Sequence, residues 1–249
     1  MLKNHTAPLQ TRKITWQEGK TAFEGHLSMN AAKSAPLPVV LVIHDWSGCN
    51  AFARGKADEI AAMGYAGFAI DLYGEGKTGQ TTEEKMALMK PLMADRALLL
   101  RRIQSAVDAV KTQPGINAKK IAVIGFCFGG LCALDLARSS REILGAVSLH
   151  GLLTPPPQEK QKTLTPLPAK ILVLHGHDDP MVPPDQLLAF EQEMTAAKAD
   201  WQVLVFGGTR HAFTNPEAND AAMGTVYNAT AARRAWIATG NFLSEVFGQ

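Results

Sequence analysis

Cysteine is scarce in this sequence, whose 249 residues include only Cys49, Cys127 and Cys132. Three thiols cannot all pair within one chain, and none belongs to a Cys-x-x-Cys unit, so a disulfide scaffold is excluded. No apolar run approaches the ~18–20 residues that cross a bilayer, and the N-terminal segment has no apolar stretch typical of a secretory signal. We therefore expect a cytoplasmic protein without a membrane partner, because the reducing cytosol suits unpaired thiols.

A strong charge bias is missing as well. The chain has 25 Lys and Arg against 23 Asp and Glu, a formal net charge of +2. Such a balance gives no electrostatic reason to expect nucleic acid as a partner. Hydrophobic residues make up 46% and charged residues 19% of the chain, which is typical of a folded globular protein and excludes general disorder.

Short apolar runs rich in β-branched residues alternate with segments of helical spacing. This alternation predicts βαβ units, a mostly parallel sheet of about eight strands and flanking helices. The expected strands are Arg12–Thr15, Phe23–Met29, Val39–Ile43, Tyr65–Leu72, Ile121–Ile124, Ala146–His150, Lys170–His175 and Trp201–Phe206. The expected helices are Ala51–Met63, Thr81–Lys111, Gly129–Arg138, Asp185–Lys198 and a largely helical tail, Asn219–Phe247.

The chain shows no internal repeat and no linker-like change of composition, so residues 1–249 are expected to form a single α/β domain. The first two strands, within residues 1–30, should join the same sheet. Thr81 and Glu84 form a capping-box pattern at the start of the long helical stretch, and Pro91 should break or kink that helix. The connection between residues 150 and 170 is too short for a separate cap domain.

The segment Gly125–Gly130, Gly-Phe-Cys-Phe-Gly-Gly, lies between a buried strand and a helix. This is the pattern of a nucleophile elbow with Cys127 in the place of the usual serine. The glycines permit a very tight turn, and the start of the helix favours a thiolate. The alternative is a glycine-rich corner with an inert buried thiol. A phosphate-binding loop is not indicated, because its lysine-containing pattern is absent.

A thiol nucleophile needs a base and an orienting carboxylate. Asp179 and His211 follow later strands, in the chain order nucleophile, acid, histidine that such hydrolases use. Taken singly, Asp179 could be a turn residue before Pro180 and His211 an ordinary histidine. All three residues in this order and topology point to a catalytic triad.

A metal site is the competing interpretation of the same region. His175, His177 and Asp179 have the spacing of a metal-binding His-x-His-x-Asp pattern, and His211 lies downstream. Pro180 stands where that pattern requires another histidine, however. We therefore expect no metal and no cofactor.

These motifs resemble the dienelactone hydrolase family, a cysteine branch of the α/β-hydrolases, from about Val39 to the C-terminus. The resemblance is carried by the Cys127 turn, by His175–Pro183 with its Gly-x-x-Asp-x-x-Val-Pro pattern, and by His211-Ala-Phe. It implies an α/β-hydrolase fold without a cap domain, with Cys127 as nucleophile, Asp179 as acid and His211 as base. Asp178 is the near alternative for the acid.

The resemblance also implies an oxyanion hole formed by the backbone amides of Trp46 and Phe128. Such donors are typically worth ~3–4 kcal/mol each in the transition state. Family members carry a glutamate that activates the cysteine where this chain has Asp45, one methylene shorter. Asp45 is thus the expected activating residue, with loop capping as the alternative. The Trp46 side chain could also form an apolar wall.

A second departure from the family concerns substrate binding. Where the family has an arginine for the substrate carboxylate, four residues after the histidine, this chain has Asn215. Lys85, Arg54 or Arg210 could supply a cation instead, although surface solvation is the simpler role for Lys85 and Arg54. We therefore expect Asn215 in the substrate site and a preference for uncharged substrates.

Taken together, the sequence predicts a hydrolase that cleaves a small ester or lactone through a thioester acyl-enzyme. Its only expected partners are the small-molecule substrate and, if it is not a monomer, copies of itself in a small homo-oligomer. A non-catalytic binding protein on the same fold is the alternative from another class.

Overall fold

The structure is a computed structural model that describes residues 8–32, 36–157 and 163–248. Part of the N-terminal segment used to argue against a secretory signal lies outside these ranges, as do parts of the loop at 31–38 and of the connection at 151–169. Among the described residues, no helix is long and apolar enough to span a bilayer.

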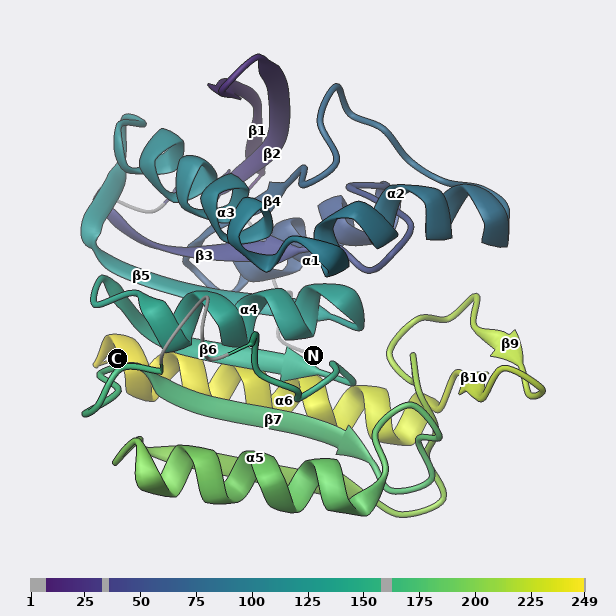
Figure 1. Ribbon diagram of the computed structural model, residues 1–249. Helices are drawn as coiled ribbons and strands as arrows, with labels where there is room; N and C mark the ends of the chain where they lie inside the picture. Colours follow the sequence, from purple (N-terminus) through teal and green to yellow (C-terminus); the bar gives the residue numbers. More distant parts are fainter. Residues whose placement is uncertain (1–7, 33–35, 158–162, 249) are drawn as a thin grey trace, which may run out of the picture.

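One eight-stranded sheet forms the centre, in the order β1-β2-β4-β3-β5-β6-β7-β8 (Figure 1). The ribbon of β1 and β2 is antiparallel and joins β4 in antiparallel fashion, and all other neighbours are parallel. All eight expected strands are present, and the N-terminal pair belongs to the sheet as predicted. Their bounds are β1 Leu9–Glu18, β2 Thr21–Asn30, β3 Leu37–Ile43, β4 Ala66–Ile70, β5 Ile116–Phe126, β6 Ile143–Leu149, β7 Lys170–Gly176 and β8 Trp201–Phe206.

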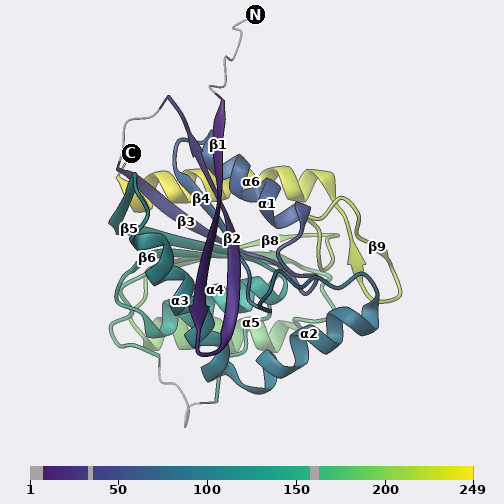
Figure 2. The same cartoon turned by 90° about the horizontal axis from the view of Figure 1, so that it is seen from above.

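Helices cover both faces of the sheet, and no cap domain stands over it in the described part of the chain. Figure 2 shows α1 and α6 on one face and α3, α4 and α5 on the other. Each face buries its own apolar cluster against the β-branched side chains of the central strands, because strands buried on both sides must be apolar throughout. The helices are α1 Ala51–Ala62, α2 Thr82–Ala94, α3 Arg96–Lys111, α4 Phe128–Ser139, α5 Pro184–Ala196 and α6 Ala229–Phe247.

The helices that follow β3 and β5 lie on opposite faces of the sheet. The chain passes from β3 through α1 to β4, whereas β5 continues through α4, which packs with the opposite apolar cluster. Because β3 and β5 are neighbours in the sheet, their carboxyl ends border a topological switch point. In open α/β sheets, ligands bind in the crevice at such a point.

The break in the long helical stretch falls at Asp95, so the prediction of a break or kink at Pro91 was wrong about the place. Pro91 lies inside α2, near its end, where it removes a single helical bond. Asp95 has φ −123° and ψ 83°, and its carboxylate accepts from the amide of Leu98 at 3.0 Å, which caps α3. The expected capping box of Thr81 and Glu84 is present.

The tail is helical only from Ala229, so the prediction of a largely helical Asn219–Phe247 was wrong for its first third. That part forms a small hairpin, β9 Asn219–Asp220 and β10 Thr225–Val226. Gly224 between them has φ +79°, which a helix does not permit. Asn228 then caps α6 by accepting from the amide of Ala231.

A buried ionic cluster joins α4 to its neighbours. Arg96 of α3 pairs with Asp135 of α4, and Arg138 of α4 pairs with Glu193 of α5. The two arginines also donate to carbonyls of the connection after β6: Arg138 to Leu153 at 2.8 Å, and Arg96 to Thr154 at 3.4 Å. Charged hydrogen bonds therefore hold this connection to α3 and to α4, the helix that follows Cys127.

Candidate active site

Cys127 joins β5 to α4 with φ 55° and ψ −116°, a conformation that side chains rarely adopt. The flanking glycines make this turn possible. A Cβ on Gly125 would come within 1.9 Å of the Gly129 carbonyl oxygen, and one on Gly129 within 2.4 Å of the Ile43 carbonyl oxygen. The turn is thus packed against the end of β3, with the thiol at the N-terminus of α4, where the helix dipole favours a thiolate.

The structure brings Cys127, His211 and Asp179 together in one line of contacts. His211 Nε2 lies 3.0 Å from Cys127 Sγ, and His211 Nδ1 lies 2.7 Å from Asp179 Oδ2. His211 and Asp179 are buried, and Cys127 is half-buried. Asp178 is exposed, and the histidine contact is made by Asp179, which favours Asp179 as the acid.

The charges in this line support one another. Burial opposes a charge on His211, but the Cys127 thiolate and the Asp179 carboxylate together raise the pKa of His211 to about 10. The imidazolium form of His211 is therefore favoured beside the Cys127 sulfur at neutral pH.

The hairpin that replaces the start of the expected tail helix holds the His211 backbone. The amide of His211 donates to the Gly224 carbonyl, and the amide of Val226 donates to the His211 carbonyl, both at 3.0 Å. These bonds fix the histidine between the end of β8 and the hairpin. Sequence reasoning missed this support.

The segment after β3 carries Asp45 and Trp46 to the same edge of the sheet. The Trp46 carbonyl accepts from the Tyr73 hydroxyl at 2.8 Å, and in the described chain the amides of Trp46 and Phe128 have no protein acceptor. Both amides are therefore available to a ligand oxygen. The Asp45 carboxylate accepts from the Ser47 amide at 2.8 Å, which is a loop-capping contact, and activation of Cys127 by Asp45 stays a prediction.

The candidate substrate residues are spread around this edge. Asn215 lies on the His211 loop, and its side-chain oxygen accepts from the Glu217 amide at 3.0 Å. Lys85 Nζ lies 5.5 Å from the centre of the Trp46 ring. Arg210 donates to the Ala221 carbonyl. Lys85 thus places a cation beside the predicted oxyanion segment.

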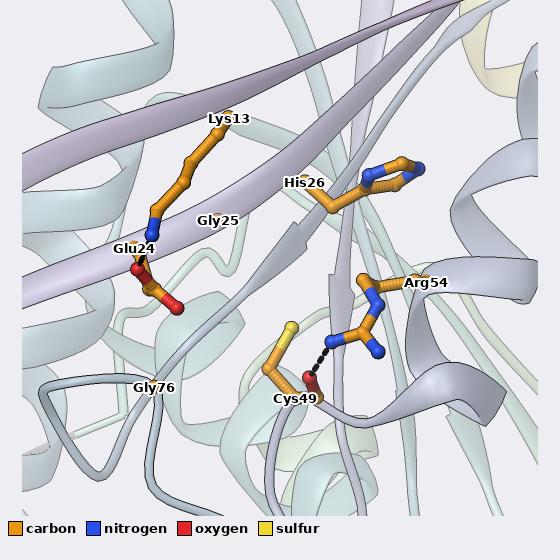
Figure 3. A pocket seen from close by; sticks show the side chains of 7 residues that line it. All are labelled: Lys13, Glu24, Gly25, His26, Cys49, Arg54 and Gly76. Carbon is orange, nitrogen blue, oxygen red and sulfur yellow. Dashed lines mark hydrogen bonds and ion pairs between the residues drawn. The ribbon is translucent and has the colours of Figure 1, made fainter.

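Arg54 belongs to a different place, a cavity of about 260 Å³ beside Cys49 (Figure 3). Its guanidinium donates to the Cys49 carbonyl at 2.8 Å. Lys13 and Glu24, which pair with each other, line the same cavity. Arg54 is therefore placed away from the line of Cys127, His211 and Asp179.

The metal interpretation finds no matching ligand set. Within residues 8–32, 36–157 and 163–248, no three His, Cys, Asp or Glu side chains are grouped so that they could hold a metal ion. The Asp179 carboxylate is already shared by His211 and the Met181 amide. His177, which the metal pattern requires, is exposed.

Two buried residues beside the site were not predicted. His150, directly after β6, has its Nδ1 3.1 Å from the Cys127 amide and its Nε2 2.7 Å from the Thr214 hydroxyl. A histidine at the carboxyl end of a central strand was the available signal. Thr214 belongs to no motif that the sequence offered.

This sheet order, with a strained turn after β5 and an acid and a histidine after β7 and β8, defines the α/β-hydrolase class. The model of the dienelactone hydrolase family matches residues 23–247. A dienelactone hydrolase-like promiscuous phosphotriesterase from metagenomic libraries has a similar crystal structure, with a TM-score of 0.90 and 35% identity, covering 96% of this chain and 99% of the other.

Two further proteins are similar to this chain, one in sequence and one in fold. One from Aquifex aeolicus (strain VF5), named "Putative carboxymethylenebutenolidase", is 30% identical over 82% of this chain and 87% of its own length. A dienelactone hydrolase from Anabaena variabilis ATCC 29413 shares the fold, with a TM-score of 0.64 and 21% identity over 96% of this chain and 97% of the other. The chain belongs to the dienelactone hydrolase family. It is, by that membership, a carboxylic ester hydrolase.

Proposed function

We propose that this enzyme hydrolyses small esters or lactones with Cys127 as nucleophile, His211 as general acid and base, and Asp179 as the group that orients His211. The observation that carries the proposal is the pair of contacts, 3.0 Å and 2.7 Å, that links Sγ through the imidazole to the carboxylate. A thiolate paired with an imidazolium needs no further base before it attacks.

In the first half-reaction, the Cys127 thiolate adds to the ester carbonyl. The developing oxyanion accepts hydrogen bonds from the Trp46 and Phe128 amides. When the carbon–oxygen bond breaks, the His211 imidazolium gives its proton to the departing alkoxide. The products of this half-reaction are the alcohol and a thioester on Cys127.

In the second half-reaction, the neutral His211 takes a proton from water, and the resulting hydroxide attacks the thioester. The carboxylic acid leaves, and the thiolate and imidazolium are restored. Asp179 keeps the Nδ1 proton in place throughout, so that Nε2 always faces the reacting atoms. The mechanism uses no metal or cofactor.

A burst experiment with p-nitrophenyl acetate tests the proposal. We expect about one equivalent of p-nitrophenol per enzyme, followed by slower turnover, together with an acetyl group on the Cys127 peptide. Cys127→Ala should abolish both phases, whereas Cys49→Ala, the matched control, should retain them. A burst that survives in Cys127→Ala would contradict the nucleophile assignment. A wild-type protein with no burst or turnover on a panel of esters would support the alternative of a binding protein.

Neutral phosphotriesters form a second candidate substrate class. The support is the similarity to the promiscuous phosphotriesterase, at 35% identity over 96% of this chain. In such a reaction the Cys127 sulfur would bond to phosphorus, an aryloxide would leave, and water would release the phosphodiester. Loss of phosphotriester turnover in Cys127→Ala, in parallel with ester turnover, is the expected result.

The cytosol remains the proposed location, because Cys49, Cys127 and Cys132 are all unpaired thiols. We further propose that residues 1–249 act as one domain, since the described helices pack on a single sheet. A monomer or a small homo-oligomer is the proposed assembly.

A further inference from the structure

His150 touches both halves of the proposed reaction centre, although the mechanism assigns it no proton. Its Nδ1 lies 3.1 Å from the Cys127 amide nitrogen, and its Nε2 lies 2.7 Å from Thr214 Oγ1, on the loop that carries His211. We propose that His150 is a positioning residue that sets the separation of the Cys127 sulfur and the His211 imidazole. The proposal rests on the function proposed above.

The contacts of His150 allow one protonation state. The Cys127 amide is a donor, so Nδ1 must accept and Nε2 must carry the proton that the Thr214 hydroxyl accepts. A second proton on Nδ1 would face an N–H group, and His211 is only 5.4 Å away, ring to ring. Burial, together with repulsion from His211, lowers the pKa of His150 well below its ordinary value. His150 is therefore a neutral neighbour that does not compete with the His211 charge.

The rest of the imidazole is enclosed by aromatic rings. Phe213 lies edge-on at 5.1 Å and Phe126 at 6.2 Å between ring centres, and His150 is only 2% exposed. Its backbone also has a positive φ of 42°, unusual for a residue other than glycine. A side chain held this firmly can transmit a fixed position to the groups that it contacts.

The Cys127 turn needs such support, because strained backbone persists only where its surroundings determine it. The Cys127 amide donates to the Leu149 carbonyl at 3.0 Å and to His150, so two acceptors share it. Without His150, the turn and the His211 loop each lose one restraint. A misplacement of about 1 Å between reacting groups can cost about 100-fold in rate.

The test compares His150→Gly and His150→Asn. Glycine removes the imidazole without straining the backbone at positive φ, whereas asparagine also tolerates positive φ and places an amide oxygen near the position of Nδ1. Thr214→Val removes the other contact. Ser148→Ala, on the same strand, is the matched control, because the Ser148 hydroxyl is buried and has no hydrogen-bond partner in the described part of the protein.

Two measurements are made on each variant, namely kcat and KM for p-nitrophenyl acetate and the rate of Cys127 alkylation by iodoacetamide against pH. For His150→Gly we expect kcat to fall about 100-fold with little change in KM, and the midpoint of alkylation to rise by about one pH unit, a tenfold weaker coupling of thiolate and imidazolium. His150→Asn should recover most of both. In the wild-type background, Thr214→Val should lower kcat about threefold to tenfold. In the His150→Asn background it should lower kcat no further, because that variant has already lost the contact to the Thr214 hydroxyl.

A purely structural role predicts a lower Tm with an unchanged alkylation profile, and that result would overturn the proposal. Equal losses in His150→Gly and His150→Asn would overturn it as well. If His150→Gly does not fold, the double-mutant cycle of His150→Asn and Thr214→Val replaces it. Losses in kcat that add up in the double variant would contradict the proposal. Alkylation does not depend on ester turnover, so a shifted profile without any hydrolase activity would reject the proposed function and leave the positioning role standing.

Discussion

Cys127 and Cys49 lie in opposite chemical settings, although each precedes a helix after a central strand. Cys127 Sγ lies 3.0 Å from Nε2 of the His211 imidazole. Cys49 lines a cavity with Arg54, Lys13 and His26 (Figure 3), and the His26 imidazole contacts the Asp58 carboxylate. Burial, with a smaller contribution from Asp71, raises the pKa of Cys49 to about 12 despite Arg54. A cavity and nearby cations therefore do not lower the pKa of a buried thiol, and the proposed nucleophile is the cysteine that contacts an imidazole.

The largest effect on kcat should come from removing the carboxylate that contacts His211. Asp179→Asn should lower kcat by about 1,000-fold or more with the fold intact, because His211 loses the group that fixes its tautomer and stabilises its charge. Asp178→Asn, its exposed neighbour, is the control and should cost little. Steady-state kinetics with circular dichroism measure both. A reversed order of the two effects would place the acid one residue earlier.

Chemical labelling should sharpen the contrast between the thiols. We expect iodoacetamide at pH 7 to alkylate Cys127 more than about tenfold faster than Cys49 or Cys132, because the thiolate is the reactive form. Burial raises the pKa of both other cysteines. Peptide mapping after brief treatment measures the three rates. Preferential labelling of Cys49 would mean that its cations outweigh its burial.

A third variant brings a cation to the loop that carries His211. Asn215→Arg should raise kcat/KM for carboxylate-bearing lactones about tenfold to 100-fold, since a charged hydrogen bond is worth about 1.5–3 kcal/mol. Neutral esters should not gain. Loss of the Asn215 contact to the Glu217 amide sets the lower end of this range.

Lys85→Gln is the companion variant, because Lys85 stands over Trp46. If the wild type already prefers dienelactone to a neutral ester and Lys85→Gln removes that preference, Lys85 supplies the positive charge that binds the substrate carboxylate. The expected preference for uncharged substrates would then be wrong.

The centre of the sheet could be predicted from the sequence because its central strands contain short apolar runs, rich in β-branched residues, that are buried on both faces. The Cys127 turn was equally accessible, since glycines at 125, 129 and 130 are required wherever backbone segments approach this closely. The Gly-x-x-Asp-x-x-Val-Pro pattern of the family that the sequence resembles favoured Asp179 over Asp178, and the 2.7 Å contact to His211 agrees with that choice.

One error was local, and the other arose where residues distant in sequence decide the outcome. Asp95 ends one helix and caps the next by its own side chain, a local effect that outweighs Pro91. The hairpin at 219–226 exists because it bonds to the His211 backbone, which no local pattern reports. His150 could not be assigned for the same reason, since its two contacts come from residues 23 and 64 positions away.

The connection after β6 offers a site for protein engineering. Arg138 and Arg96 hold its beginning through the carbonyls of Leu153 and Thr154, and the Leu164 amide donates separately to the Arg138 carbonyl. Because each end is held on its own, a longer segment grafted between them leaves both attachments intact. Each doubling of loop length costs only ~0.6 kcal/mol in closure entropy. A segment inserted here is therefore expected to lengthen the connection at low cost in stability, without displacing α4 or the Cys127 turn at its start.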